Sequence, residues 1–261
     1  MIQILAGAFG FLAALAAHDL AAQVLADNPL RPLAGTCPQC GTKRGWLSAR
    51  CASCSRPIAR EVGIALAGTV GAVAFVNTIG ITWALVSYMG FLVLSLALVI
   101  TDIEAMRIVD RLNIRGTLLL VVALGAGAAL DGSIDAFWRA LLGALAYFSG
   151  TNLVFLLVRG RGFGYGDVKL SIQLGLFTAY VSWGTLGWSV FLMAMIGGLI
   201  SIGVIVVGSV ARRQRARSDV GAETPTLRDA LKVELPYGPA MVAGAWIALA
   251  LAGIGAFPIP S

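Results

Sequence analysis

The chain has 261 residues, of which 58% are hydrophobic and 12% are charged, whereas soluble domains carry about 25% charged residues. Its mean hydropathy is +0.87. These values exclude a disordered chain, a coiled coil and an ordinary nucleic-acid-binding domain, and they indicate a polytopic integral membrane protein. The net charge of +6 therefore has to be interpreted from where the basic residues lie relative to the membrane.

Eight stretches of the chain approach the length and apolar character of a membrane-spanning helix, which needs about 20 residues. Leu and Ala dominate them, with Gly spread through them, and small residues allow helices to pack closely in lipid. We therefore expect an all-α fold of about eight transmembrane helices. In chain order the stretches cover residues 2–25, 62–80, 82–100, 114–130, 136–158, 168–184, 186–210 and 238–257. The Gly-Thr-Leu-Gly sequence at 184–187 indicates a turn or a kink.

The basic residues gather in alternate connections between the predicted helices. Of the 19 Lys and Arg residues, 18 lie in or beside the first, third, fifth and seventh connections, and only Arg139 lies on the opposite side. Because basic loops face the cytoplasm, this alternation supports the helix count and predicts that both termini face outward.

The same pattern predicts how the chain is divided. We expect a first transmembrane helix over 1–26, a small cytoplasmic loop over 27–60 and a transmembrane region over 61–261. The Arg-rich loop near the end of that region should attract anionic membrane lipid, not nucleic acid. The cytoplasmic loops of the transmembrane region are expected at 101–115, 159–169 and 211–235.

All four cysteines lie in the loop over 27–60, as two Cys-x-x-Cys pairs. Such pairs supply four thiolates, which suits tetrahedral structural zinc. The loop is too short to bury a sizeable core, and a metal would supply folding free energy. Disulfides are disfavoured in the reducing cytoplasm, and thiol redox chemistry is the competing interpretation. The expected zinc ligands are Cys37, Cys40, Cys51 and Cys54.

Two aspartates are candidates for chemistry, because acidic residues at the ends of membrane helices are costly. Asp102 and Asp167 stand at the cytoplasmic ends of two predicted helices, so their side chains can lie at the same depth. Two adjacent carboxylates share a proton, and such a pair can activate water and polarise a carbonyl, as peptide hydrolysis requires. A helix cap or a solvated charge is the competing interpretation of each aspartate. Gly164 and Gly166 allow close backbone approach and unusual dihedral angles before Asp167.

Four features together resemble the type IV prepilin leader peptidases, a family of membrane aspartic proteases with a Gly-x-Gly-Asp motif. Residues 164–170, Gly-Tyr-Gly-Asp-Val-Lys-Leu, match the most specific motif of the family, and residues 102–110 resemble its first aspartate segment. The paired cysteines resemble its cytoplasmic zinc loop. Residues 235–239, Leu-Pro-Tyr-Gly-Pro, resemble the motif that opens its last helix.

The resemblance implies that Asp102 and Asp167 are the catalytic aspartates, with Gly164, Gly166 and Lys169 supporting the motif. The substrates would be type IV prepilins or pseudopilins, cleaved after a short basic leader at the cytoplasmic face of the bacterial inner membrane. Zinc would be a structural cofactor. Many members of the family also methylate the new N-terminus with S-adenosylmethionine. The resemblance leaves this second activity open, because the N-terminal segment departs from the family pattern.

Several polar residues near these motifs have simpler interpretations. Val109 stands where the family has proline, so the turn after the first aspartate is expected to bend differently. Glu104 and Asp110 are expected to be solvated loop charges. His18 and Asp19 in the first helix are expected to make a polar contact and are not assigned to catalysis. For Lys169 the alternatives are a partner for local negative charge and a membrane-interface anchor.

Two other functions remain open at this point. An ion-coupled transporter would use intramembrane acids as a proton or cation relay, although it would favour acids near mid-membrane and broken helices. A membrane thiol oxidoreductase would use the Cys-x-x-Cys pairs and would lose all activity when the cysteines are replaced.

Overall fold

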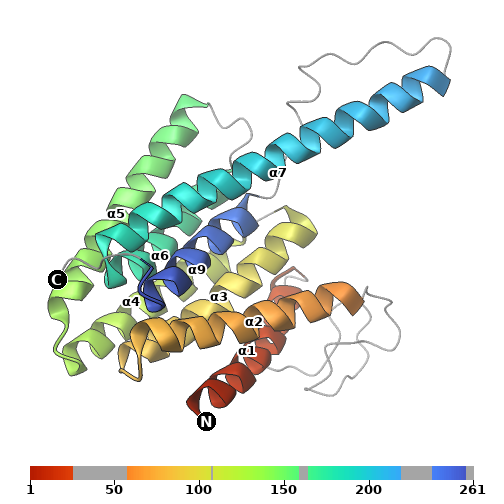
Figure 1. Cartoon of the computed structure of the whole chain (residues 1–261). Coiled ribbons are helices and arrows are strands. Elements are labelled where there is room, and N and C mark those ends of the chain that lie inside the picture. Colours follow the sequence, from red (N-terminus) through yellow and green to blue (C-terminus); the bar gives the residue numbers. More distant parts are fainter. Residues whose placement is uncertain (26–57, 107, 159–163, 219–236, 257–261) are drawn as a thin grey trace.

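The structure, a computed structural model, describes residues 1–25, 58–106, 108–158, 164–218 and 237–256. Within these ranges the chain is all-α, with one helix for each predicted apolar stretch (Figure 1). The helices are α1 (Ile2–Leu25), α2 (Ile58–Ile79), α3 (Ala84–Ala105), α4 (Asp110–Leu130), α5 (Ile134–Leu157), α6 (Tyr165–Val181), α7 (Trp183–Ser218) and α9 (Gly238–Gly253).

The helix lengths agree with a polytopic membrane protein. Six of the described helices, α1, α2, α3, α4, α5 and α7, contain stretches long and apolar enough to cross a membrane. The remaining two, α6 and α9, have 17 and 16 residues. The long α7 extends well beyond the rest of the bundle (Figure 1).

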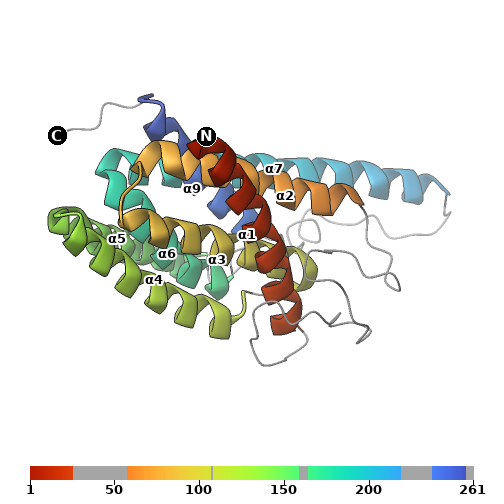
Figure 2. The same ribbon diagram turned by 90° about the horizontal axis from the view of Figure 1, so that it is seen from below.

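The helices form two layers that meet at α3. In Figure 2, α2, α9 and α7 form one layer, while α3, α4, α5 and α6 form the layer beneath it, and α1 crosses α2 and α3 at one side. Residues of α3 are buried on every side of the helix. The two helices that carry the candidate aspartates, α3 and α6, are thus both largely buried in the bundle.

An aromatic cluster joins both layers. Phe91 of α3 stacks on Phe177 of α6 with ring centroids 4.3 Å apart, and Phe75 of α2 stacks on Phe91 at 5.8 Å. The hydroxyl of Tyr88 donates a hydrogen bond of 2.6 Å to the carbonyl of Phe177. Aromatic pairs of this kind add to the free energy gained from burial alone. The cluster thus fixes α3 against α6, the two helices that carry the candidate aspartates.

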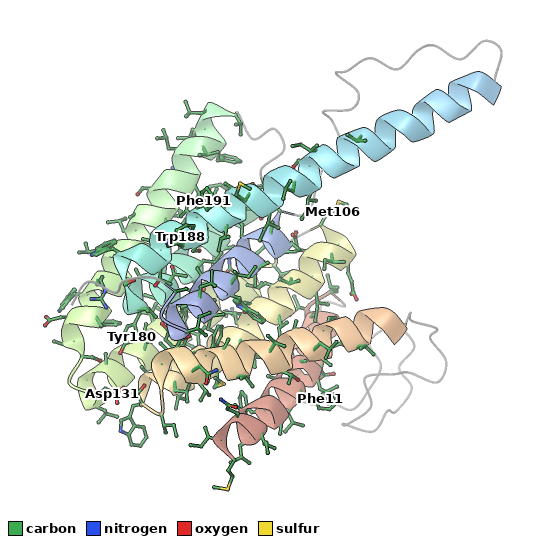
Figure 3. The ribbon with its side chains drawn as sticks, in the orientation of Figure 1. Phe11, Met106, Asp131, Tyr180, Trp188 and Phe191 are labelled. Carbon is green, nitrogen blue, oxygen red and sulfur yellow. The ribbon has the colours of Figure 1, made fainter. Side chains whose placement is uncertain are left out.

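On the side of the bundle away from the aspartates, polar side chains form hydrogen bonds with the backbone N–H and C=O groups at helix ends. Asp131, in the turn after α4 (Figure 3), accepts the backbone N–H groups of Trp83 and Ala84 at 3.0 and 2.9 Å, at the start of α3. Arg139 donates to the carbonyls of residues 179, 180 and 181 at the end of α6. A cation at a helix C-terminus is favourable, so Arg139 stabilises the end of α6.

Four predicted loop or turn segments differ from the structure. Residues 101–115, predicted to be a loop, are mostly helical, because α3 continues to Ala105 and α4 begins at Asp110. The turn expected at 184–187 lies earlier, at Ser182, which has extended backbone between α6 and α7. The predicted loops at 159–169 and 211–235 begin or end inside helices, since α6 starts at Tyr165 and α7 continues to Ser218.

Candidate functional site

Asp102 lies in the last turn of α3 and is 6% exposed. Its Oδ2 accepts a hydrogen bond of 3.0 Å from the backbone N–H of Gly238, the first residue of α9. A Cβ atom added at Gly238 would lie 2.7 Å from the same oxygen. A side chain at this position would therefore displace the carboxylate. Glycine is needed here because the backbone of residue 238 lies so close to Asp102.

Asp167 lies in the first turn of α6 and is also 6% exposed. Its Oδ2 accepts the backbone N–H of Gly164 at 3.1 Å, while its own N–H donates to the Gly164 carbonyl at 3.1 Å. These reciprocal bonds close the first turn of the helix. They hold the carboxyl group at the point where the chain enters α6.

The expectation of unusual dihedral angles at the Gly-x-Gly sequence is wrong. Gly164 has an ordinary extended backbone with φ −78° and ψ 148°, and no positive φ occurs at either glycine. Gly166 matters through close approach instead, because an added Cβ would lie 3.0 Å from Cβ of Ile108. The start of α6 therefore packs directly on the turn that follows Asp102.

The two aspartates act on each other electrostatically. Burial, and to a smaller extent the negative charge of Asp102, raise the pKa of Asp167 to about 7, although the hydrogen bond from Gly164 lowers it. A carboxyl group with such a pKa retains its proton at neutral pH in a large fraction of molecules. The structure thus brings the two predicted side chains, from α3 and α6, into one site, while their catalytic role stays a prediction.

Tyr237 is a third member of the site, and the sequence analysis did not single it out. Burial raises the pKa of its hydroxyl, and the charge of Asp167 adds to this. Its ring packs on α7 at Gly197, where an added Cβ would overlap the phenol. Residues 237 and 238 therefore face one aspartate each. The Pro-Tyr-Gly-Pro sequence before the last predicted helix was the available signal.

Lys169 does not lie free beside the aspartates. Its Nζ lies 2.7 Å from both carboxylate oxygens of Asp110 and 5.2 Å from the ring centroid of Tyr165. Asp110, expected to be a solvated loop charge, is instead the first residue of α4. The ion pair connects the start of α4 to the first turns of α6.

Comparison with known proteins agrees with this geometry. Residues 89–206 match the family model described as the type IV leader peptidase family. Over this segment the chain is similar to the type IV leader peptidase family. The matched segment includes Asp102 and Asp167 and ends within α7. It therefore contains both candidate aspartates, whereas Gly238 and the cysteines lie outside it.

Relatives are similar over most of the chain. The chain is 29% identical over 208 residues to a prepilin leader peptidase/N-methyltransferase of Aeromonas hydrophila, which covers 78% of this chain and 63% of that protein. Proteins of the same name from Pseudomonas aeruginosa and Bacillus subtilis are 29% and 28% identical, covering 82% and 65% of this chain and 70% and 57% of their own length. The chain thus spans less than two thirds of the first of these relatives. No solved structure matches the chain.

The remaining polar residues named from the sequence fall into two groups. Cys37, Cys40, Cys51 and Cys54 lie outside the described residues. Within the described ranges, no cluster of three or more His, Cys, Asp or Glu side chains could hold a metal ion. His18 and Asp19 are buried on α1, where Asp19 accepts a hydrogen bond of 2.8 Å from the side-chain amide of Gln23. This contact is made by Asp19 with Gln23, and the polar contact expected of His18 stays a prediction.

Proposed function

We propose that this chain is a membrane aspartic endopeptidase that removes the short basic leader from type IV prepilins or pseudopilins. The observation that carries the proposal is the buried, electrostatically coupled pair formed by Asp102 and Asp167. Aspartic proteases require two carboxyl groups that share one proton. The names of the relatives, prepilin leader peptidase/N-methyltransferase, supply the substrate class.

The environment of each carboxyl group suggests its role. We assign the shared proton to Asp167, because burial and the neighbouring charge raise its pKa to about 7. Asp102, held by the N–H of Gly238, would accept a proton from the attacking water. Asp167 would donate a hydrogen bond to the scissile carbonyl and stabilise the negative charge that develops on its oxygen. Collapse of the tetrahedral intermediate then breaks the C–N bond, with a proton passing to the leaving amine.

The surroundings of the aspartates fit a substrate that arrives from the membrane. Ile103, Met106 and Tyr165 expose 51%, 56% and 49% of their surface next to Asp102 and Asp167 in the sequence. Figure 3 places Met106 at the end of α3. An apolar substrate helix can dock laterally against such side chains, with its leader junction at the membrane surface. The distribution of basic loops supports a cytoplasmic position for this surface in the bacterial inner membrane.

Two further parts of the proposal concern cofactors. We propose that the four cysteines bind one structural zinc ion, which is supported by their spacing. No step of peptide hydrolysis as described here involves this metal. The relatives also carry N-methyltransferase in their names, so methylation of the new N-terminus by S-adenosylmethionine is a second activity to measure in the same experiment.

The deciding experiment is incubation of the purified protein in detergent with a prepilin peptide that contains a basic leader and an apolar segment. Mass spectrometry of the products gives cleavage, the position of the cut and any added methyl group. Asp102→Asn and Asp167→Asn should each abolish cleavage while the protein remains folded, and Asp135→Asn, at the opposite end of the bundle, should cleave normally. Cleavage by either active-site variant at the wild-type rate would refute the proposal.

The same variants separate the alternative functions. A proton relay predicts proton flux in proteoliposomes that depends on Asp102, with no peptide cleavage. A thiol oxidoreductase predicts that replacement of the four cysteines by serine removes activity outright. The proposed peptidase retains its chemical step in that variant, although a smaller amount of folded protein is expected.

A further inference from the structure

Three contacts connect the turn after Asp102 and the start of α4 to the first turns of α6. Ile108 packs against Gly166. Next along both segments, Asp110 pairs with Lys169 at 2.7 Å. One helical turn deeper, the side-chain amide of Gln173 lies 3.5 Å from Oδ1 of Asn113. We call the four polar residues Asp110, Asn113, Lys169 and Gln173 the α4–α6 clamp.

The positions of the clamp residues follow from helix periodicity. Asp110 and Asn113 are three residues apart on α4, and Lys169 and Gln173 are four residues apart on α6. Residues at these spacings lie on one face of a helix. The clamp therefore aligns one face of α4 with one face of α6 over about one helical turn.

Each half of the clamp is close in sequence to one of the two aspartates. Helix α3, which carries Asp102, ends at Ala105, and α4 begins soon afterwards at Asp110. On the other side, Lys169 is two residues beyond Asp167. The two carboxylates accept hydrogen bonds from different backbone N–H groups, that of Gly238 for Asp102 and that of Gly164 for Asp167. Their separation therefore depends on how these two segments are held against each other.

We propose that Asp110 and Lys169 are positioning residues, which hold the turn after Asp102 against the start of α6 and so set the separation of the two catalytic carboxyl groups. This inference rests on the proposed peptidase function. The charge of Lys169 is bound by both oxygens of Asp110, so the lysine acts through the geometry of α4 and α6.

Of the two polar contacts between α4 and α6, the ion pair of Asp110 and Lys169 has the shorter distances, 2.7 Å against 3.5 Å for the amides of Asn113 and Gln173. The Asn113 amide nitrogen and the Gln173 amide oxygen have no hydrogen-bond partner among the described residues, although the two side chains are only 1% and 0% exposed. A contact of 3.5 Å between amides is at the limit of a hydrogen bond. Asp110 and Lys169, in contrast, are 55% and 25% exposed, and exposed ion pairs contribute little to folding stability. Breaking the ion pair should therefore change the site more than the fold.

The test uses steady-state cleavage of the prepilin peptide by Asp110→Asn, Lys169→Met and the charge swap Asp110→Lys with Lys169→Asp. Asp135→Asn is the matched control, because Asp135 is also acidic and in the first turn of its helix. The single variants should lose roughly tenfold in kcat with KM unchanged, since small misplacements of catalytic groups are costly. Thermal unfolding should be unchanged, and the swap should recover most of kcat.

The pH profile provides a readout that a purely structural role would not change. The charge of Asp102 on α3 and the hydrogen bond from Gly164 act on Asp167, and Tyr237 faces it before α9. If the clamp breaks and the carboxyl groups separate, their coupling weakens, so the upper limb of the pH–rate profile should move to lower pH. A wild-type kcat, or a fall in kcat with an unchanged pH profile, would overturn the positioning role.

Failure of the proposed function can be distinguished from failure of this inference. If the wild-type protein does not cleave the peptide, the peptidase proposal fails, and the clamp is tested by thermal unfolding alone. The difference in Tm between Asp167→Asn and its parent, measured at pH 8, should then be smaller in an Asp110→Asn background than in the wild-type background. An equal difference in both backgrounds would overturn the inference.

Discussion

Replacement of Asp167 by asparagine should remove activity and at the same time stabilise the protein at alkaline pH. Asparagine retains an oxygen that can accept the N–H of Gly164 and cannot ionise. The pKa of Asp167 rises from 3.8 to about 7 on folding, and one pKa unit corresponds to about 1.4 kcal/mol. Ionised Asp167 therefore opposes folding by up to roughly 4 kcal/mol.

The sign of this effect fixes its pH dependence. Because the folded-state pKa is higher than the unfolded-state value, the folded protein binds the proton more tightly. The cost of Asp167 is absent below about pH 4, grows as the pH rises and is complete above about pH 7. Asp167→Asn should consequently unfold several degrees above the wild type at pH 8, and at the same temperature near pH 4.

Thermal unfolding in detergent, followed by intrinsic fluorescence at pH 4.5 and pH 8, measures this difference. Asp135→Asn is the control, because Asp135 is exposed in the first turn of α5 and its replacement should change Tm little at either pH. A difference between Asp167→Asn and wild type that does not depend on pH would refute the reasoning that the carboxyl group is buried with a raised pKa.

Three other predictions concern the site and the cysteine loop. Wild-type cleavage should fall above about pH 7, because Asp167 loses the shared proton; a rate that stays constant up to pH 9 would contradict this. Gly238→Ala should lower kcat by roughly tenfold or more through displacement of Asp102, whereas Gly187→Ala, with open space around it, should cleave normally; equal rates would show that the close approach is unimportant. The purified chain should contain one zinc ion, lost when the four cysteines are replaced by serine, and chelation should leave peptide cleavage unchanged; metal analysis and the cleavage assay test both statements.

The helices were predictable from the sequence because their signal is local. A run of about 20 apolar residues can only be satisfied in lipid or in a large core, and all eight predicted stretches correspond to helices. The helix ends were less predictable. Asp102 and Asp110 lie inside α3 and α4, because the polar side chains find partners in other helices and the backbone remains helical up to a short turn.

The partners of the aspartates could not be predicted for a related reason. Gly238 is 136 residues from Asp102, and Asp110 is 59 residues from Lys169. No local sequence pattern predicts contacts between residues this far apart in the chain. The motif around Asp167 was recognisable because its glycines, aspartate and lysine are adjacent in the chain.

The position of α9 gives a reason why the site needs a third helix. Asp102 stands at the C-terminal end of α3, where the partial negative charge of the helix opposes a carboxylate. The N-terminus of α9 brings the opposite partial charge and a free backbone N–H to the same carboxylate. Asp167 has an N-terminus of its own in α6. Docking of α9 therefore places both carboxyl groups at the starts of helices, which fits the proposed role of Asp102 as the base of the pair.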